Sequence, residues 1–361
     1  MLMETLLQIM VVITSLMFVL IITPLLRKIA IQINLVDKPN MRKIHNQNTP
    51  LIGGISIWIA SIITMLITIQ GWQDFLKIKW LWIGGTILLL VGIIDDKNDI
   101  RASLKLAVQL LLAHFSFIQG IKITSMYGIL GIYEIPAEMQ YVLTIIVITG
   151  VINAFNLMDG IDGLVAGLAI IGLIVFSWLA WITNNQSLMI FYFSLIGALI
   201  GFLKYNFSKT KKIFMGDAGS LFLGFVFVVS AIILIQSAQK IEKTSIVVPS
   251  IIGVLFLPVF DSLRVYRARI KQGKSPFKAD KTHFHHLVLS LGLGHKMATI
   301  LIVFVLCILL IISLMIGNLG NFTLMLVSML FFFWVSSKIL EINAQIVEWQ
   351  EKIKKIEHQK F

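Results

Sequence analysis

The sequence has almost no cysteine and few charged residues. Cys307 is the only cysteine among 361 residues, so one chain can hold neither a disulfide nor a cluster of thiolate metal ligands. Charged residues make up only 13% of the chain and hydrophobic residues 58%, with a mean hydropathy of +0.92. This composition is far too apolar for a soluble globular protein. The sequence therefore predicts an integral membrane protein that crosses the bilayer many times.

Apolar stretches of about 17 to 25 residues, the length that a membrane-spanning helix needs, recur along the whole chain. The first has no basic segment and no small-residue cleavage site, so we expect a retained helix rather than a signal peptide. No fixed-period repeat and no Pro- or Ser-rich linker divides the chain. We predict an all-α fold: one polytopic helical bundle over residues 1–340, followed by a tail at 341–361. The eleven expected spans lie near residues 5–26, 51–69, 79–94, 104–120, 141–158, 163–183, 187–203, 218–238, 245–263, 297–316 and 321–340.

The basic residues indicate which side each loop faces. If successive spans alternate in direction, only five of the 30 Lys and Arg residues fall on one side: Lys77, Lys79, Lys122, Lys240 and Lys243. Because cytoplasmic loops carry the excess of Lys and Arg, the other side is predicted to be cytoplasmic, with the N-terminus outside and the C-terminus inside. The formal charge of +12 is then explained by topology and by anionic membrane lipids. No aromatic and basic soluble domain supports a nucleic-acid partner.

Two segments outside the expected spans carry regular patterns. Residues 121–139 alternate apolar residues around glycines, which predicts a short hairpin on the outer surface. The tail places apolar residues at helical spacing among charges, which predicts an amphipathic helix at the inner interface, with a solvated helical end as the alternative. The apolar residues of the tail are Ile342, Ile346, Trp349, Ile353 and Ile356.

Aspartates gather on the predicted cytoplasmic side. Only Asp74 of the ten aspartates falls outside. Any single one could simply cap a helix, but nine on one face indicate a functional surface. These nine are Asp37, Asp95, Asp96, Asp99, Asp159, Asp162, Asp217, Asp261 and Asp280.

Two of the aspartate motifs favour a metal ion. Asp95 and Asp96 directly follow an apolar run; adjacent carboxylates repel unless water, a cation or a shifted pKa relieves them. Mg²⁺, commonly held by one or two carboxylates and substrate phosphates, would do so. Asp217 stands between glycines just before another apolar run, where it can cap a helix while backbone N–H groups approach an anion. An ordinary helix cap is the alternative for both motifs.

The longest cytoplasmic loop, residues 264–296, is rich in Arg, Lys and His. Its H-x-H-H group lacks a cysteine and the H-E-x-x-H pattern, so it is poor evidence for zinc. Such a cluster suits a polyphosphate, because guanidinium groups make bidentate contacts with phosphate. Lys271 and Lys278 are expected only to mark the cytoplasmic side. The candidate phosphate- and sugar-binding residues are Arg264, Arg267, His283, His285 and His286, together with Asp37, Arg42 and His45 of the first loop.

The stretch "NAFNLMDGIDGL", residues 153–164, carries a polar residue at every third position. Residues three apart on a helix differ by about 300°, so Asn153, Asn156, Asp159 and Asp162 would fan over half the circumference and could not face one ligand. Gly160 and Gly163 favour a break near residues 158–160 that turns both aspartates towards the site that Asn156 faces. A carboxylate at the bilayer centre costs roughly 2.5–3.5 kcal/mol, so the motif is expected at the cytoplasmic boundary. For Asn153, a polar contact between helices is the alternative.

Five motifs occur in order along nearly the whole chain: "DKPNMRKIHNQNTPLIGG", "DDKNDI", "NAFNLMDGIDGL", "FMGDAGS" and "GKSPFKADKTHFHH". In these the sequence resembles the polyprenyl-phosphate N-acetylhexosamine-1-phosphate transferases, of the glycosyltransferase family 4 type. The resemblance implies transfer of a sugar 1-phosphate from a UDP-sugar to undecaprenyl phosphate, release of UMP, and a need for Mg²⁺ or Mn²⁺. It also implies a multi-pass protein of the bacterial inner (cell) membrane with a cytoplasmic active site.

The H-x-H-H form is closer to the undecaprenyl-phosphate GlcNAc-1-phosphate transferase branch than to the peptidoglycan-precursor branch. That branch starts O-antigen, common-antigen or teichoic-acid linkage synthesis. The resemblance thus implies UDP-GlcNAc as the donor, with another UDP-N-acetyl sugar or a peptidoglycan-precursor donor as alternatives. Self-association as a homodimer stays open.

The resemblance also implies roles for individual residues. Asn156 and Asp217 resemble metal ligands, and Asp95 and Asp96 resemble the catalytic pair that serves the attacking lipid phosphate. Asp159 and Asp162 correspond to nucleotide-binding positions, with Asp162 near the uracil ring. Arg267 and the three histidines resemble a rim that holds diphosphate and sugar, and the first loop is expected to help hold phosphates.

Two mechanisms and several other functions remain alternatives. The lipid phosphate could attack directly, aligned by an aspartate, or the reaction could pass through a covalent aspartyl-phosphate. An intramembrane prenyltransferase also uses aspartates and magnesium but has no use for the histidine loop. A CDP-alcohol phosphotransferase shares only the "DG" of "MDGIDGLVAGLA", since no Arg follows. A transporter of anionic metabolites would explain polar groups at broken helices, but it predicts polar residues deep in the spans.

Overall fold

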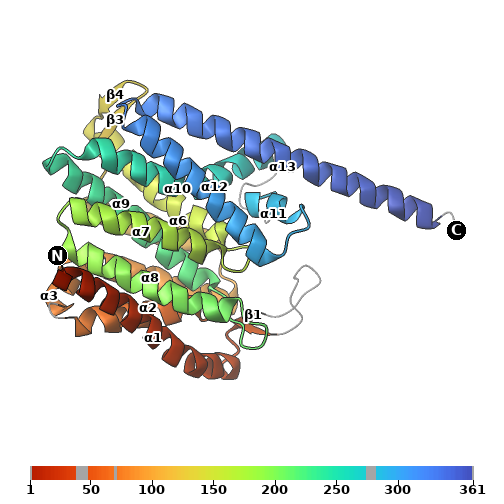
Figure 1. The fold of residues 1–361 in the computed structure, drawn as a ribbon, viewed down its shortest axis with the longest axis horizontal. Coiled ribbons are helices and arrows are strands. Elements are labelled where there is room, and N and C mark those ends of the chain that lie inside the picture. Colours follow the sequence, from red (N-terminus) through yellow and green to blue (C-terminus); the bar gives the residue numbers. More distant parts are fainter. Residues whose placement is uncertain (1, 38–47, 69–70, 274–281, 360–361) are drawn as a thin grey trace.

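The computed structural model describes residues 2–37, 48–68, 71–273 and 282–359. Long helices run side by side and form one bundle (Figure 1). The helices are α1 Leu2–Gln32, α2 Gly53–Ile67, α3 Gly71–Lys77, α4 Lys79–Asn98, α5 Ala102–Ile118, α6 Ala137–Met158, α7 Leu164–Ile182, α8 Gln186–Asn206, α9 Gly216–Lys240, α10 Thr244–Lys271, α11 Phe284–Leu289, α12 His295–Gly317 and α13 Phe322–Gln359.

Each of the eleven expected spans coincides with one of these helices. Among the described residues, eight helices are long and apolar enough to cross a membrane: α1, α6, α7, α8, α9, α10, α12 and α13. The apolar helices α2 and α5 are shorter, and α4 carries the charges of Asp95, Asp96 and Lys97 in its last turn. The prediction of an all-α, multi-pass membrane protein is confirmed; the number of crossings and their direction stay predictions.

Helix α9 lies in the middle of the bundle and is buried over most of its length. It packs against α4, α6 and α2, and small residues permit the close approach. A Cβ atom on Gly92 of α4 would collide with the backbone of Ala218, and one on Gly54 of α2 with Gly219. Close packing through small residues is typical of membrane helices. Here it draws the Asp95 end of α4 onto the Asp217 end of α9.

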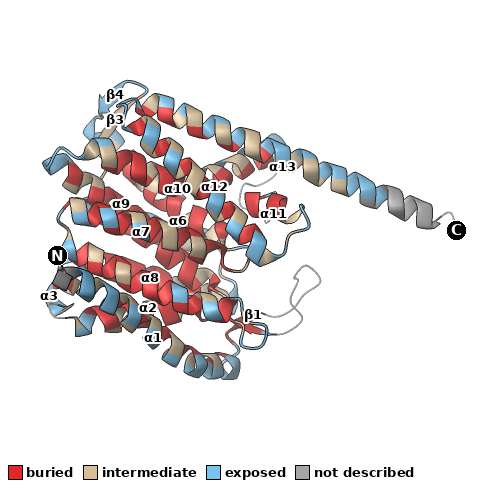
Figure 2. Cartoon of the chain, in the orientation of Figure 1, coloured by how far each residue is buried: buried red, intermediate tan, exposed pale blue. Residues whose placement is uncertain are grey.

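Apolar side chains cover much of the outside of the bundle. Figure 2 shows red, buried residues concentrated in α8 and α9, while α1, α12 and α13 carry many exposed positions. Large apolar residues such as Ile21, Met315 and Phe331 are among the exposed ones. Contiguous exposed apolar surface of this extent is expected where a protein meets lipid or a partner.

The connections fall at the two ends of the bundle. The predicted hairpin is confirmed as β3 (Ser125–Ile129) paired antiparallel with β4 (Ile132–Glu134). It lies at the end opposite α11 and β1 (Figure 1), and its place on the outer surface stays a prediction. Strand β1 (Val36–Asp37) pairs with β2 (Thr49–Pro50), and neither was predicted. The tail is helical as predicted, because α13 continues without a break to Gln359.

Candidate active site

Three segments far apart in the sequence bring acidic groups together at one end of the bundle. They are the last turn of α4, the turn between α6 and α7, and the start of α9. Lys105 of α5 links two of them, with its Nζ atom 2.6 Å from Oδ2 of Asp95 and 3.0 Å from Oδ2 of Asp217. Asn156 of α6 is an electrostatic neighbour of Asp217, and its Nδ2 donates to the Ser220 hydroxyl of α9 at 3.1 Å. The candidate metal ligands are therefore neighbours.

Lys105 was not singled out in the sequence. Its position, in the first turn of an apolar helix, is typical of a lysine that merely marks a membrane boundary. The structure instead gives its ammonium group two carboxylate partners. A single positive charge thus stands among several negative ones.

Asp95 and Asp96 have different surroundings although they are adjacent. Asp95 accepts from the Ile100 backbone N–H at 2.9 Å and from Lys105. Asp96 accepts from the backbone N–H groups of Asp217 and Ala218, at 2.9 and 3.3 Å. Asp96 thereby caps the N-terminus of α9, where anions are favoured. The anion that the glycine-flanked turn was expected to bind is, in this structure, the carboxylate of Asp96.

The cluster is short of positive charge. Asp95 and Asp96 lie beyond the predicted span, which ends at Ile94. Burial and the neighbouring Asp217 carboxylate raise the pKa of Asp95 to about 6 and that of Asp96 to about 7. Burial, together with repulsion from Asp217 and Asp96, holds the pKa of Asp159 well above its usual range. Raised carboxyl pKa values report buried charge that is incompletely neutralised.

The predicted helix break is confirmed. Helix α6 ends at Met158 and α7 begins at Leu164. Between them Gly163 has φ +76°, a conformation that suits glycine, and its N–H donates to Oδ1 of Asn206 at 2.6 Å. Asn153 belongs to the continuous part of α6 and exchanges hydrogen bonds with Gln109 of α5. The alternative reading of Asn153, as a polar contact between helices, therefore holds.

Asp162 is held by two basic groups that the sequence did not suggest. Its Oδ2 atom lies 2.7 Å from Lys212 Nζ and 3.0 Å from His295 Nδ1. Burial alone would raise the pKa of Asp162, but the hydrogen bonds from His295 and Lys212 outweigh burial and lower it. Both contacts use Oδ2. The other oxygen, Oδ1, has no hydrogen-bond partner among the residues that the structure describes.

Asp261 organises the histidine loop. This residue of α10 is completely buried and accepts from His283 Nδ1 at 2.9 Å, from the Phe284 N–H at 3.1 Å and from Arg264 Nη2 at 2.8 Å. These contacts fix the start of α11, a helix that was not predicted. The sequence signal was available, since Asp261 lies within an apolar run one turn before Arg264. Arg264 itself also pairs with Glu341 at 3.0 Å, so much of its hydrogen-bonding capacity is used inside the protein.

The histidines lie against the turn between α6 and α7. A Cβ atom on Gly160 would collide with the His285 ring, so this glycine leaves room for the histidine. His285 stacks on His283 with 5.8 Å between ring centroids and tilts against His286 at 4.3 Å. Burial lowers the pKa of His285 to about 3, which keeps the ring neutral. Within the described part of the chain, the buried His283 Nε2 and His285 Nδ1 atoms have no hydrogen-bond partner.

The remaining candidates are less closely defined. Arg267 is exposed and makes no ion pair with any residue that the structure describes. Asp37 lies in β1, opposite Thr49 of β2. The chain after β2 hydrogen-bonds to the segment that precedes Asp217, with Gly53 N–H donating to the Phe214 carbonyl at 2.9 Å, so the first loop returns beside the acidic cluster. The candidates Arg42 and His45, and also Lys278 and Asp280, lie outside the described residues.

A metal held here would need substrate ligands. In residues 2–37, 48–68, 71–273 and 282–359, no group of three or more His, Cys, Asp or Glu side chains is arranged to hold a metal ion. The available set is Asp217 and Asn156, with Asp95 linked to them through Lys105. Mg²⁺ is usually bound in this way, by one or two carboxylates and by phosphates of the substrate.

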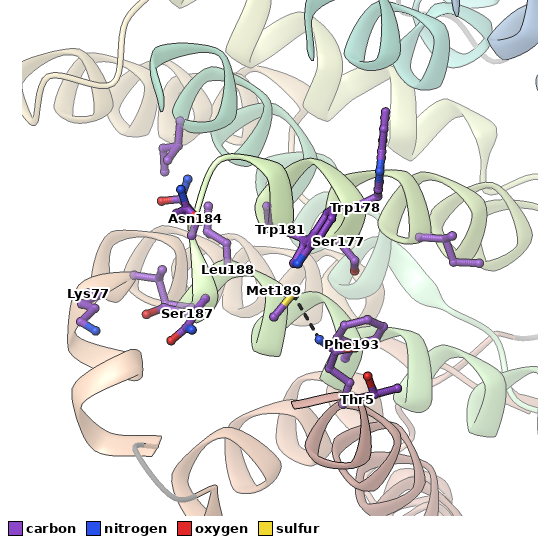
Figure 3. A pocket seen from close by; sticks show the side chains of 17 residues that line it. Thr5, Lys77, Ser177, Trp178, Trp181, Asn184, Ser187, Leu188, Met189 and Phe193 are labelled. Atoms are coloured by element: carbon purple, nitrogen blue, oxygen red, sulfur yellow. Dashed lines mark hydrogen bonds between the residues drawn. The ribbon is translucent and has the colours of Figure 1, made fainter. Parts of the chain in front are cut away.

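Two cavities lie outside the acidic cluster. One, of about 740 Å³, lies between α1, α3, α7 and α8 and is lined by Lys77, Trp181, Asn184 and Ser187 (Figure 3). It is at the Ile182 end of α7, away from the Asp162 end. The other, of about 450 Å³, is an apolar groove between α6, α9 and α10 that reaches Leu263, two residues from Asp261.

Comparisons with known proteins identify the family of this chain. Residues 78–235 match glycosyl transferase family 4, a range that contains all three segments of the acidic cluster. A probable undecaprenyl-phosphate N-acetylglucosaminyl 1-phosphate transferase of Bacillus subtilis (strain 168) is 38% identical over 293 residues, which are 80% of this chain and 79% of the relative. Undecaprenyl-phosphate alpha-N-acetylglucosaminyl 1-phosphate transferases of Yersinia pestis and Escherichia coli (strain K12) are 34% and 31% identical, each over 76% of this chain and 75% of the relative.

Proposed function

The chain belongs to glycosyl transferase family 4, and on this premise we propose that it transfers a sugar 1-phosphate from a UDP-sugar to undecaprenyl phosphate and releases UMP. The named relatives act with N-acetylglucosamine, so UDP-GlcNAc is the proposed donor. The observation that carries the proposal is the meeting of Asp95, Asn156 and Asp217 at the end of the bundle where the histidine loop also lies. The product would be the lipid-linked starting unit of a cell-envelope glycan, made at the cytoplasmic face of the bacterial inner membrane.

A divalent cation fits the acidic cluster. All the available donors are the oxygens that Mg²⁺ prefers, and the raised pKa values of Asp95 and Asp96 reflect a need for positive charge that Lys105 alone does not meet. We propose that Asp217 and Asn156 hold Mg²⁺, or Mn²⁺ in its place. When bound, the ion would supply positive charge to the diphosphate oxygens and to the leaving UMP.

The apolar groove supports a lipid acceptor. It is lined by Val147 and Val151 of α6, by Val228 of α9 and by Leu255 and Val259 of α10, among other apolar residues. A polyprenyl chain could bury itself there while its phosphate reaches the acidic end of the bundle. Asp95 would then orient the lipid phosphate for in-line attack or accept its proton. Asp96, which caps α9, would act by fixing Asp217 in place.

The donor would occupy the other side of the cluster. Oδ1 of Asp162 can accept the N3–H of a uracil ring, because Lys212 and His295 both contact Oδ2. Arg267 offers hydrogen-bond donors to the diphosphate. Nε2 of His283, which is an acceptor while Nδ1–H donates to Asp261, and Nδ1 of His285 are available to hydroxyl groups of the sugar. These positions put the nucleotide at the α6–α7 turn, the phosphate of the acceptor beside Asp95, and the polyprenyl chain in the groove between α6, α9 and α10.

The transfer itself can be measured with purified protein, UDP-[14C]GlcNAc and polyprenyl phosphate. We expect labelled lipid and UMP release that depends on polyprenyl phosphate. Asp217→Ala and Asp95→Asn should abolish transfer, whereas Asp99→Asn should not, because Asp99 is exposed and its left-handed backbone tolerates Asn. Near wild-type transfer by folded Asp217→Ala and Asp95→Asn proteins would contradict the assignment. Label that crosses a vesicle membrane without entering lipid would indicate a transporter instead.

Two further measurements define the reaction. A panel of UDP-sugars identifies the donor by comparing kcat/KM values; preference for a sugar other than GlcNAc would correct the specificity but not the reaction. The stereochemistry at phosphorus tests the route. Inversion is expected for direct attack by the lipid phosphate, and retention would indicate a covalent aspartyl-phosphate.

A further inference from the structure

The last helix continues well beyond the bundle. Residues 322–340 of α13 would span about 28 Å at 1.5 Å per residue, which is close to the thickness of a hydrocarbon core. From Glu341 to Gln359 the same helix runs on for about as far again, and Figure 1 shows this part projecting straight out of the bundle. Residues 341–361 contain neither Pro nor Gly, the usual causes of a sharp kink. The helix therefore points away from the membrane rather than along its surface.

This projecting helix exposes a narrow apolar stripe. The exposed fractions are 62% for Ile339, 49% for Ile342, 51% for Ile346 and 67% for Trp349. The spacings of three, four and three residues place them at alternating a and d positions of a heptad. In the sequence, Ile353 and Ile356 occupy the next two such positions. A strict a/d stripe is the seam of a coiled coil, narrower than the apolar face of a helix that packs on a globular core.

The protein's own contacts leave this stripe uncovered. Glu341 turns towards α10, where it binds Arg264 at 3.0 Å, and Asn343 Nδ2 lies 3.5 Å from the Ser290 carbonyl. Glu341 is a c residue, on the side of the helix away from the stripe, whereas Asn343 is an e residue at the edge of the stripe. Ile342, Ile346 and Trp349 lie beyond residue 340, where the predicted span ends, and large apolar side chains exposed there indicate a partner.

Charge and membrane geometry both favour another copy of the chain as that partner. With Ile346 and Ile353 at a, Lys352 is a g residue and Glu357 is an e residue. In a parallel coiled coil, g of one helix meets e of the next heptad in its partner, so each Lys352 would face a Glu357. Two copies in one bilayer have α13 at the same depth and in the same direction, which aligns these positions without an axial shift. Within one chain Lys352 contacts Glu348 at 2.7 Å, but this exposed pair contributes little.

We propose that residues 339–356 of α13 form a parallel, in-register coiled coil with the same segment of another copy of this chain. This surface lies outside the proposed active site and does not depend on the transferase reaction. Ile at the a positions and at most of the d positions shifts the preference towards three or four strands, with Trp349 at the remaining d position. The proposal fixes the register: each a residue contacts the same residue of the other copy, and the c residues face away from the other copy.

The register can be tested by disulfide cross-linking of full-length protein in nanodiscs. In a Cys307→Ser background, Ile346→Cys should form cross-linked oligomers under mild oxidation, whereas the matched control Glu348→Cys, at an exposed c position, should not. Lys352→Glu should slow cross-linking at position 346 about fivefold, and adding Glu357→Lys should restore it. Glu348 and the new Glu at position 352 repel each other within one chain in both the single and the double variant. Recovery of cross-linking in the double variant therefore reports only the contact between chains.

Several outcomes would overturn the proposal. Equal cross-linking at positions 346 and 348 would indicate random collision. Failure of Ile346→Cys to cross-link in purified protein would mean that lipid or a different protein covers the stripe. Unchanged thermal unfolding of the variants shows that the fold is intact, so a negative result cannot be attributed to misfolding.

Discussion

Replacement of Asp261 by asparagine should detach the histidine loop from the bundle. Asp261→Asn keeps the shape of the side chain but removes its charge and replaces one acceptor with a donor. In the native protein the carboxylate binds three donors, on His283, Phe284 and Arg264, at 2.8 to 3.1 Å. The amide cannot accept from all three, and at least one donor is left unpaired in a fully buried place.

The size of the effect follows from these contacts. Removing one partner of a buried ion pair costs about 3–5 kcal/mol. Arg264 is partly exposed and keeps its second partner Glu341, so we expect the lower end, on the order of 3 kcal/mol. If that energy holds His283 and His285 in place during transfer, kcat/KM for the UDP-sugar should fall by about 100-fold. Because Asp261 has no contact with Asp95 or Lys105, the loss should appear mainly as weaker use of the donor.

The assay compares Asp261→Asn with Asp74→Asn. Asp74 is also buried, at 2% exposure, and accepts from Ser187 at 2.7 Å, but it lies at the other end of the bundle. Both variants should lower the midpoint of thermal unfolding, and only Asp261→Asn should lower transfer by folded protein. Transfer by Asp261→Asn within about threefold of wild type, or an equal loss in both variants, would refute the positioning role.

Three further perturbations follow from the same contacts. Lys105→Met removes a positive charge 3.0 Å from Asp217. The Mg²⁺ concentration for half-maximal activity should therefore fall, and turnover should fall at least tenfold. An unchanged Mg²⁺ requirement would mean that the cation binds elsewhere. Gly160→Ala places a methyl group against His285 and should raise KM for the UDP-sugar. Gly150→Ala, with open space around it, should leave this KM unchanged. Equal KM values in the two variants would contradict the contact between residue 160 and His285. The pKa of His285 is about 3 in the folded protein and about 6.5 in the unfolded chain. Between about pH 3 and pH 6.5, therefore, only the unfolded chain takes up a proton on this ring. Stability should therefore fall as pH drops below about 6.5, by about 2 kcal/mol at pH 5, and the drop in unfolding midpoint should be smaller in His285→Gln; an identical pH profile would show that the ring is accessible.

The positions of the helices could be read from the sequence because a bilayer imposes a simple rule. Each of the eleven expected apolar stretches is helical, since a backbone in hydrocarbon must satisfy its hydrogen bonds within the segment. The break after Met158 was also predictable, because polar residues three apart cannot face one direction on a continuous helix. The short helix α11 and the pairing of β1 with β2 were not predicted, because six-residue and two-residue elements carry too little pattern.

The charge partners in the site could not be read from the sequence. Asp162 lies 133 residues from His295 and 50 from Lys212, and Lys105 lies 112 residues from Asp217. Such pairs form only when particular helices pack side by side. The candidate roles of the predicted residues stay predictions, and those of Arg42 and His45 fall outside the described residues.

The sequence by itself determined the membrane environment, the helical segments and the gathering of aspartates between them, because hydropathy, length and charge act locally. Tertiary structure decided what each aspartate does. Asp95 and Asp96 are adjacent, and the sequence does not indicate different roles for them. In the structure Asp95 binds Lys105, whereas Asp96 caps α9. That difference arises because α4 and α9 approach closely enough, through Gly92 and Ala218, for one carboxylate of the pair to reach the backbone of the facing helix.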